Sequence, residues 1–248
     1  MREYYDFIFK RKSFHLFQDT GVLSPDELED LKTFIKAVKP LDSSIRISIE
    51  IAAERETTCK RGAEYCILFY SEARDHFLQN IGYIGEQIDL YLAAKNIGAL
   101  WLGTGKPKEC AENGLDFVIM LAIAKVPEKN FRRDLFKAKR KSEEEIWLGR
   151  RLEAANVVRF APSACNTQPW VTESSGDTLS VYRYGKAGKR GIMPAGKVSY
   201  YNRIDIGIFL CFLEVCLCHG SVKFERTLYA DTGGDEEKAL NAVYRIQC

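Results

Sequence analysis

The sequence has 248 residues, of which 46% are hydrophobic, and 36 Lys and Arg against 34 Asp and Glu leave a net charge of +2. This composition is too apolar for a disordered chain and too neutral for a protein that binds nucleic acid or a membrane surface through charge. A chain of this length can bury an apolar core without disulfides.

Three further features bear on the compartment. The first residues carry charge where a secretory signal needs an apolar run, so we expect a cytoplasmic protein. The longest apolar stretch, Ile206–Cys218, contains Glu214 and is too short for a membrane span, which predicts a buried helix instead. The eight cysteines form no CxxC pair, so we expect reduced thiols, mostly in the core.

Helix and strand patterns alternate in the first half. A helix is expected over residues 4–9, and Ser24-Pro25-Asp26-Glu27 forms a capping box for a helix that reaches about Val38. Isoleucines at every second position over 45–51 predict a half-buried strand. We also expect a strand over 64–70, a helix over 82–97 that Gly98 ends, and a central apolar strand over 116–124.

The second half follows a basic segment, 129–141, that is the predicted connector between two domains, 1–128 and 142–248. Ser142-Glu143-Glu144-Glu145 is a second capping box and predicts one helix to about Arg159, before Ala161-Pro162. The predicted class is α+β. The remaining expected elements are strands over 170–173, 178–183, 222–229 and 242–246, a Gly- and Lys-rich loop over 185–197 and a buried helix over 203–219.

The two buried helices suggest an internal duplication. Ile84-Gly85 aligns with Ile206-Gly207, and Gly98 aligns with Gly220, at one offset, since 206−84 and 220−98 both equal 122. Each helix precedes a strand, a short excursion and another strand. This shared order of elements favours a fused duplication.

One segment, residues 161–170, suits a ligand-binding turn. Its sequence is Ala-Pro-Ser-Ala-Cys-Asn-Thr-Gln-Pro-Trp, in which Ser, Asn and Gln supply donors and acceptors that can bind the edge of a flat polar heterocycle. Composition alone favours the alternative, a Pro-bounded turn without a ligand.

Residues 162–170 resemble the P-S-x-x-N-x-Q-P-W motif of the FMN-dependent nitroreductase family. Residues 11–17, Arg-Lys-Ser-Phe-His-Leu-Phe, resemble its N-terminal R-R-S-x-R-x-F motif, with departures at Lys12 and His15, and residues 96–105 resemble the helix end and loop over the flavin. The resemblance implies a nitroreductase-like fold with mixed or antiparallel sheets and flanking helices. It also implies FMN as cofactor and NADH or NADPH as co-substrate.

The distribution of the motifs is unusual for that family. A usual member is a homodimer in which the two motifs meet at one flavin from different subunits. Here the first motif lies in the first half and the second motif in the second half, and neither half has both. The resemblance therefore implies a fused pseudo-dimer with one flavin per chain, in which a monomer can complete the site.

The resemblance also implies which residues hold the cofactor. The first motif would bind the phosphate and ribityl chain, the second would line the ring, and a Gly-rich loop would bring backbone N–H groups near the hydride-accepting nitrogen. Two basic connector residues would complete the phosphate contact, although a solvated linker is an equally open alternative. His15, where the family has Arg, would be charged only when protonated and is a candidate modulator. The predicted cofactor-binding residues are Arg11, Lys12, Ser13, His15, Gly103, Thr104, Gly105, Lys137, Arg140, Pro162, Ser163, Ala164, Asn166 and Gln168.

Three other patterns are discounted. Gly191–Lys197 fits G-x-x-x-x-G-K, but Val198 stands where a phosphate-binding loop needs Ser or Thr, so a flap beside the substrate is the better interpretation. Cys216, Cys218 and His219 are metal-ligand types, but alternate helix positions point to different sides, and no metal site is predicted. Three histidines without G-x-S-x-G give a serine hydrolase little support.

These features predict an oxidoreductase in which FMN takes hydride from NADH or NADPH and passes it to a nitroaromatic, a quinone or a similar small acceptor. No catalytic acid or base is expected from the protein, because the flavin carries the chemistry. Neither nucleic acid nor a membrane is an expected partner. Two alternatives stay open: a flavin-binding protein without turnover, and a degenerate relative that has lost FMN and serves as an interaction protein.

Overall fold

Two compact units make up the chain in the computed structural model, which describes residues 1–109, 114–184, 191–233 and 238–247. The unit that we call the N-unit comprises Asp6–Phe77 and Ile84–Leu135. The C-unit comprises Met1–Tyr5, Leu78–Tyr83 and Phe136–Cys248. The division after Leu135 falls inside the basic segment 129–141.

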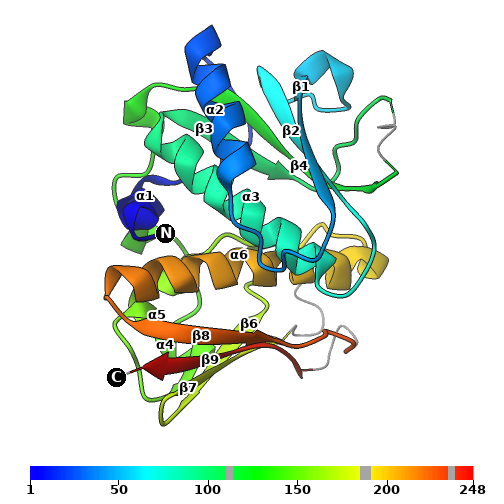
Figure 1. The fold of residues 1–248 in the computed structure, drawn as a ribbon. Helices are drawn as coiled ribbons and strands as arrows, with labels where there is room; N and C mark the ends of the chain where they lie inside the picture. Colours follow the sequence, from blue (N-terminus) through cyan, green and yellow to red (C-terminus); the bar gives the residue numbers. More distant parts are fainter. Residues whose placement is uncertain (110–113, 185–190, 234–237, 248) are drawn as a thin grey trace. The chain divides into compact units, whose positions relative to one another are not determined.

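A four-stranded antiparallel sheet forms the centre of the N-unit, with the strand order β1-β2-β4-β3. Helix α3 (Phe77–Ala94) connects β2 to β3, and its residues 84–94 run along one face of the sheet (Figure 1). The strands predicted over 45–51, 64–70 and 116–124 are confirmed, whereas β3 was not predicted. The bounds are β1 Ile47–Ala53, β2 Tyr65–Ser71, β3 Ile97–Leu102 and β4 Asp116–Lys125.

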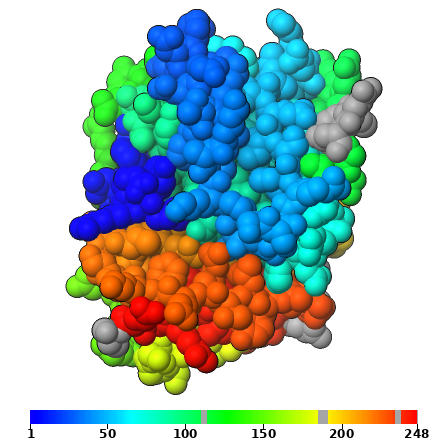
Figure 2. Space-filling view, in the orientation of Figure 1, coloured from blue at the N-terminus to red at the C-terminus, as the bar shows by residue number. Residues whose placement is uncertain are grey.

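Two helices precede this sheet, α1 (Tyr5–Lys10) and α2 (Pro25–Ala37), and both were predicted. The capping box of α2 is formed: the Glu27 N–H donates to Ser24 Oγ at 3.2 Å, and the Ser24 N–H donates to Glu27 Oε2 at 2.8 Å. Helix α2 lies on the surface, in blue near the top of Figure 2, with Leu31 as its buried residue.

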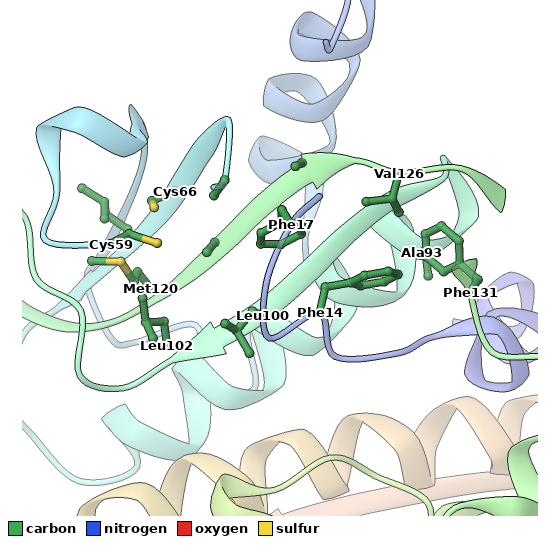
Figure 3. Packing of buried hydrophobic residues seen from close by; sticks show 14 of the residues in the cluster. Phe14, Phe17, Cys59, Cys66, Ala93, Leu100, Leu102, Met120, Val126 and Phe131 are labelled. Atoms are coloured by element: carbon green, nitrogen blue, oxygen red, sulfur yellow. The ribbon is translucent and has the colours of Figure 1, made fainter. Parts of the chain in front are cut away.

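The segment after α1 contributes two phenylalanines to the core of the N-unit. Phe14 and Phe17 lie among buried strand residues, including Leu100 and Met120 (Figure 3). A Cβ on Gly98 would lie 2.9 Å from the Phe14 ring, so this glycine permits close packing. The prediction that Gly98 ends a helix is wrong, because α3 ends at Ala94 and Gly98 lies within β3.

A five-stranded sheet forms the centre of the C-unit, with the order β5-β6-β7-β9-β8. Strand β5 is parallel to β6 and the other pairs are antiparallel. Helix α6 (Val198–His219) connects β7 to β8 and lies along the sheet (Figure 1). Without β5, the order β6-β7-β9-β8 repeats the order β1-β2-β4-β3 of the N-unit. The bounds are β5 Trp147–Gly149, β6 Trp170–Ser175, β7 Thr178–Tyr184, β8 Lys223–Leu228 and β9 Lys238–Gln247.

Helix α6 is the buried helix that the apolar run predicted, with every residue over 204–217 buried. Buried Glu214 accepts hydrogen bonds from Tyr83 Oη at 2.6 Å and Tyr244 Oη at 2.9 Å, and it forms an ion pair with Arg226. These partners satisfy a charge that would be costly to bury alone. Among the described helices, none is long and apolar enough to cross a membrane.

Two glycines allow α6 to pack closely against Leu78–Tyr83 within the C-unit. A Cβ on Gly82 would lie 2.0 Å from the Ile204 carbonyl oxygen, and a Cβ on Gly207 would lie 1.9 Å from the Gln79 carbonyl oxygen. Backbone therefore meets backbone at this crossing, where any side chain would separate the helices.

The single helix predicted from Ser142 to Arg159 is wrong. The capping box forms, with the Ser142 N–H donating to Glu145 Oε2 at 3.0 Å, but the helix ends after one turn and β5 follows. Residues 147–149 pair with β6, and this tertiary pairing outweighs the local helix preference. The remaining helices are α4 Glu143–Ile146 and α5 Ala154–Val158, with short 3₁₀ helices at Arg2–Tyr4, Glu54–Glu56, Glu128–Asn130, Leu135–Lys137, Ala164–Asn166 and Ala195–Lys197.

Candidate functional site

The segment 11–17 alternates between inward and outward side chains. Arg11, Phe14 and Phe17 are buried, whereas Lys12 and His15 are exposed. The backbone is held on both sides, because the Phe14 N–H donates to the Ala99 carbonyl at 3.0 Å and the Phe17 N–H donates to the Arg61 carbonyl at 2.8 Å. The core therefore fixes the motif and leaves its two outward basic positions accessible.

Arg11 belongs to a buried ionic network in the N-unit and is 4% exposed. Its Nε donates to Asp89 Oδ2 at 2.7 Å and lies 3.5 Å from Glu86 Oε1, and its Nη2 donates to Ser13 Oγ at 3.2 Å. Trp101 Nε1 also donates to Asp89 Oδ2, at 3.1 Å. Burial disfavours the charged guanidinium, but the pKa of Arg11 is raised, and the negative charge of Asp89 is the largest cause of the rise.

Glu86 is the group in this network whose hydrogen-bonding capacity is not satisfied. It is fully buried, and among the described residues neither carboxyl oxygen has a hydrogen-bond partner. Burial, with the charge of Asp89 second, raises the pKa of Glu86 well above its ordinary value. A protonated Glu86 leaves one positive and one negative charge, Arg11 and Asp89, and so balances the network.

A second basic residue lies beside Arg11. Arg132 is half-buried, and its Nε donates to the Arg11 carbonyl oxygen at 3.0 Å. Burial lowers the pKa of Arg132, and the positive charge of Arg11 lowers it further. The predicted connector therefore supplies Arg132 to the first motif, a residue that the sequence did not single out.

The turn 162–168 has an unusual backbone in the C-unit. Cys165, Asn166 and Gln168 have φ values of 50°, 57° and 50°, in the left-handed region that non-glycine residues seldom occupy. The Gln168 N–H donates to Ser163 Oγ at 3.0 Å and closes the turn. Such strain persists only where surrounding contacts hold it, and it is typical of functional sites.

Hydrogen bonds from the basic segment 129–141 hold the turn on one side. Arg140 Nη1 donates to Asn166 Oδ1 at 2.7 Å, and Asn166 Nδ2 donates to the Lys139 carbonyl at 3.2 Å. The Lys141 N–H donates to Gln168 Oε1 at 2.8 Å, and Lys141 Nζ donates to the Gln168 carbonyl at 2.6 Å. Gln168 is buried and serves the turn itself, while exposed Asn166 keeps a second amide proton.

Helix α6 holds the turn from its other side. Asp205 Oδ1 accepts the Ala164 N–H at 2.9 Å. The Trp170 ring, which follows the turn, stacks on Phe209 with ring centroids 4.9 Å apart. Asp205 was not predicted as a site residue, although a charge next to the apolar run of α6 was a signal for it.

The remaining predicted positions differ in environment. Gly103 and Thr104 form an exposed turn after β3, whereas Gly105 is buried and its N–H donates to the Leu102 carbonyl at 3.3 Å. Lys137 is exposed at the end of a 3₁₀ helix, and Pro162 is buried.

The structure also bears on the discounted patterns. Gly191, the first glycine of the G-x-x-x-x-G-K pattern, lies against Cys165, since a Cβ on Gly191 would be 2.7 Å from Cys165 Cβ. Residues 185–190 of the predicted Gly- and Lys-rich loop lie outside the described residues. Cys216 is buried in the core, as expected, and the His219 ring stacks on Tyr5 with centroids 3.5 Å apart.

The fold and the two motif segments define the class of nitroreductase-like α+β proteins. A protein from Thermotoga maritima described as a putative nitroreductase has a similar structure, with a TM-score of 0.58 and 19% identity over 98% of this chain and 92% of that chain. A protein from Clostridium acetobutylicum described as a putative NADH oxidase aligns with a TM-score of 0.43 and 14% identity, over 59% of this chain and 100% of that chain.

Residues 3–216 match the family described as "Putative TM nitroreductase", and the chain therefore belongs to this family of oxidoreductases. A comparison with curated protein sequences gives no significant match. The predicted α+β nitroreductase-like fold, with two sheets and flanking helices, is confirmed.

Proposed function

We propose that the chain is an FMN-dependent oxidoreductase that takes hydride from NADH or NADPH and passes it to a nitroaromatic, a quinone or a similar small acceptor. The observation that carries the proposal is the strained turn 162–168, held from two sides and matching the family's ring-binding motif. A cytoplasmic location and small-molecule partners, rather than nucleic acid or a membrane, are part of the proposal.

The residues present fit FMN in part. Among the described residues, the Ser163 hydroxyl acts only as an acceptor and one Asn166 amide proton is not used, so both side chains could donate to a polar ring edge. Lys12 and Arg132 supply positive charge at the first motif, which suits a phosphate. A contact between Arg11 and the phosphate would require the guanidinium to leave Asp89, so we propose Arg11 as the residue that holds the segment in place.

When bound, FMN supplies hydride acceptance and donation, and the residues of the chain supply its placement. The turn 162–168 would orient the ring, and Gly103 and Thr104 are the backbone contacts to the ring that the resemblance implies. His15, where the family has Arg, is the candidate modulator of the flavin, because imidazole carries a positive charge only in its protonated form.

We further propose that the chain is a fused duplication that binds one FMN and can complete its site as a monomer. The strand order β1-β2-β4-β3 of the N-unit is repeated as β6-β7-β9-β8 in the C-unit. In chain order, a long helix follows the second strand of each set, α3 after β2 and α6 after β7, and this repetition supports a duplication. The first motif lies in the N-unit and the second in the C-unit, so neither unit has both motifs.

An absorption spectrum of the purified chain, followed by FMN titration, tests the proposal. We expect the two flavin bands, one FMN per chain, and NADH or NADPH oxidation when a quinone is added. Asn166→Ala should weaken FMN binding about tenfold, because it removes a hydrogen-bond partner of the ring, which is worth about 1–3 kcal/mol. Ser180→Ala, on β7 outside the turn, is the control.

One observation favours a second candidate, a relative that has lost FMN and acts as an interaction protein. The Arg11 guanidinium is paired with acids, and the Asn166 amide is bonded to the connector. A chain that stays colourless and binds no FMN on titration would support this candidate and exclude the enzyme.

A further inference from the structure

Asp205 is a buried carboxyl group directly beneath the turn 162–168. It lies on α6 and is 3% exposed. Its Oδ1 accepts the Ala164 N–H at 2.9 Å, whereas its Oδ2 is buried and has no hydrogen-bond partner in the described part of the chain. An acid in such a place is costly, and the single bond to the turn is the contact that explains it.

The hydrogen bond between Asp205 and Ala164 contacts the turn directly before its residues of positive φ. Ala164 is the first residue of the 3₁₀ helix, and the next two residues, Cys165 and Asn166, have positive φ. Left-handed residues of this kind are held by their surroundings, because the free chain prefers other conformations. Without the acceptor on α6, the Ala164 N–H loses its anchor and the turn can relax.

We propose that Asp205 is a positioning residue that holds the turn 162–168 in its strained shape and so sets the affinity of the turn for the flavin ring. This inference rests on the proposed function. It goes beyond the resemblance, because Asp205 lies outside both motifs and acts only through the Ala164 N–H.

The protonation of Asp205 suggests the conservative variant. Burial raises the pKa of Asp205 to about 8, and the Ala164 N–H opposes this rise. At neutral pH the group is therefore mainly an uncharged acid. Asparagine keeps an oxygen acceptor in the same place without a charge, so Asp205→Asn should preserve the bond that Asp205→Ala removes.

The first test measures hydrogen exchange of residues 161–169 in the full chain without added flavin. Asp205→Ala should speed exchange in this segment at least tenfold, whereas Asp205→Asn should leave it near wild type. Val215→Ala is the matched control, because Val215 is equally buried on α6 but ten residues, or about 15 Å, further along the helix. Unchanged exchange in Asp205→Ala would overturn the inference.

The second test measures dissociation constants for FMN and for riboflavin. Because the turn would hold the ring, Asp205→Ala should weaken both ligands about tenfold and equally, and Asp205→Asn should restore both. Equal affinities in wild type and Asp205→Ala would overturn the inference while leaving the proposed function standing. A wild-type chain that binds neither flavin would overturn the proposed function and the flavin part of the inference, and the exchange data would then still decide whether Asp205 holds the turn.

A third variant removes the same bond from the other side and guards against misfolding of Asp205→Ala. Ala164→Pro deletes the N–H at the first position of a helix, where proline fits, and Ser163 before it is already extended with φ −148° and ψ 155°. The effects of the two substitutions on FMN affinity should be non-additive. The dissociation constant of the double variant should be at most about twofold higher than that of the single variant with the lower affinity. Additive losses would show that Asp205 and Ala164 act independently, against the inference.

Discussion

Gly207→Ala should destabilise the chain, because Gly207 lies where α6 crosses residues 79–83 of α3. The new Cβ would lie 1.9 Å from the Gln79 carbonyl oxygen and 2.8 Å from the Tyr83 nitrogen, both backbone atoms. Ordinary contact begins near 3.4 Å, so the helices must separate by about 1.5 Å, the difference between 3.4 and 1.9. Such a shift also strains the bonds that Tyr83 and Gln79 make to Glu214 and Asn241.

The magnitude follows from two opposing effects. Alanine in a helix interior is more favourable than glycine by about 1 kcal/mol. Overpacking costs about 1–3 kcal/mol, and the upper end applies here because two backbones, rather than a flexible side chain, must move. The net loss is about 2 kcal/mol of the free energy of unfolding, which corresponds to a fall in Tm of roughly 4–8 °C for a chain of this size.

Urea unfolding and a thermal melt of the full chain measure this loss. Gly196→Ala is the control, because a Cβ there meets nothing within 4 Å, and we expect its stability to stay within about 0.5 kcal/mol of wild type. Gly82→Ala, whose Cβ would lie 2.0 Å from the Ile204 carbonyl oxygen, should behave like Gly207→Ala. A Gly207→Ala chain as stable as wild type would refute the close helix crossing.

Three further predictions concern charges. Burial alone would raise the pKa of Asp231, but the hydrogen bond and ion pair with Arg183 lower this pKa. The ionised carboxylate therefore stabilises the fold above about pH 4, and this stabilisation is lost as the pH falls through the folded pKa. In urea unfolding, wild type should lose more stability than Asp231→Asn between pH 5 and pH 3, and equal losses in the two proteins would contradict this prediction. Lys12→Met should weaken FMN about tenfold and leave riboflavin unchanged, whereas Arg11→Met should weaken both ligands alike; an FMN-selective loss in Arg11→Met would place the guanidinium on the phosphate. The flavin midpoint potential should fall less steeply between pH 6 and 8 in His15→Arg than in wild type, and identical slopes in redox titrations would leave His15 without a role.

Local signals in the sequence were sufficient where they agree with the tertiary environment. The capping box at Ser24 predicted α2, and the apolar run from Ile206 predicted a buried helix, because side-chain periodicity and end-capping act within a few residues. The family resemblance rested on short motifs, and the match over residues 3–216 confirms that the chain belongs to a nitroreductase family. The α+β class likewise followed from the alternation of strand and helix patterns.

The tertiary structure decided features that depend on distant partners. The helix that begins after Ser142 ends early because Trp147 pairs with β6. Gly98 does not end a helix but allows the Phe14 ring to pack closely against β3. The residue type of Arg11 matched a phosphate-binding motif, but its side chain contacts Asp89 and Glu86, which lie on a helix more than 70 residues away in the sequence. Asp205 likewise became a site residue only when α6 brought its carboxyl group under Ala164. A charge in an apolar helix is visible in the sequence, but the group that it meets is chosen by packing between segments that the sequence does not place side by side.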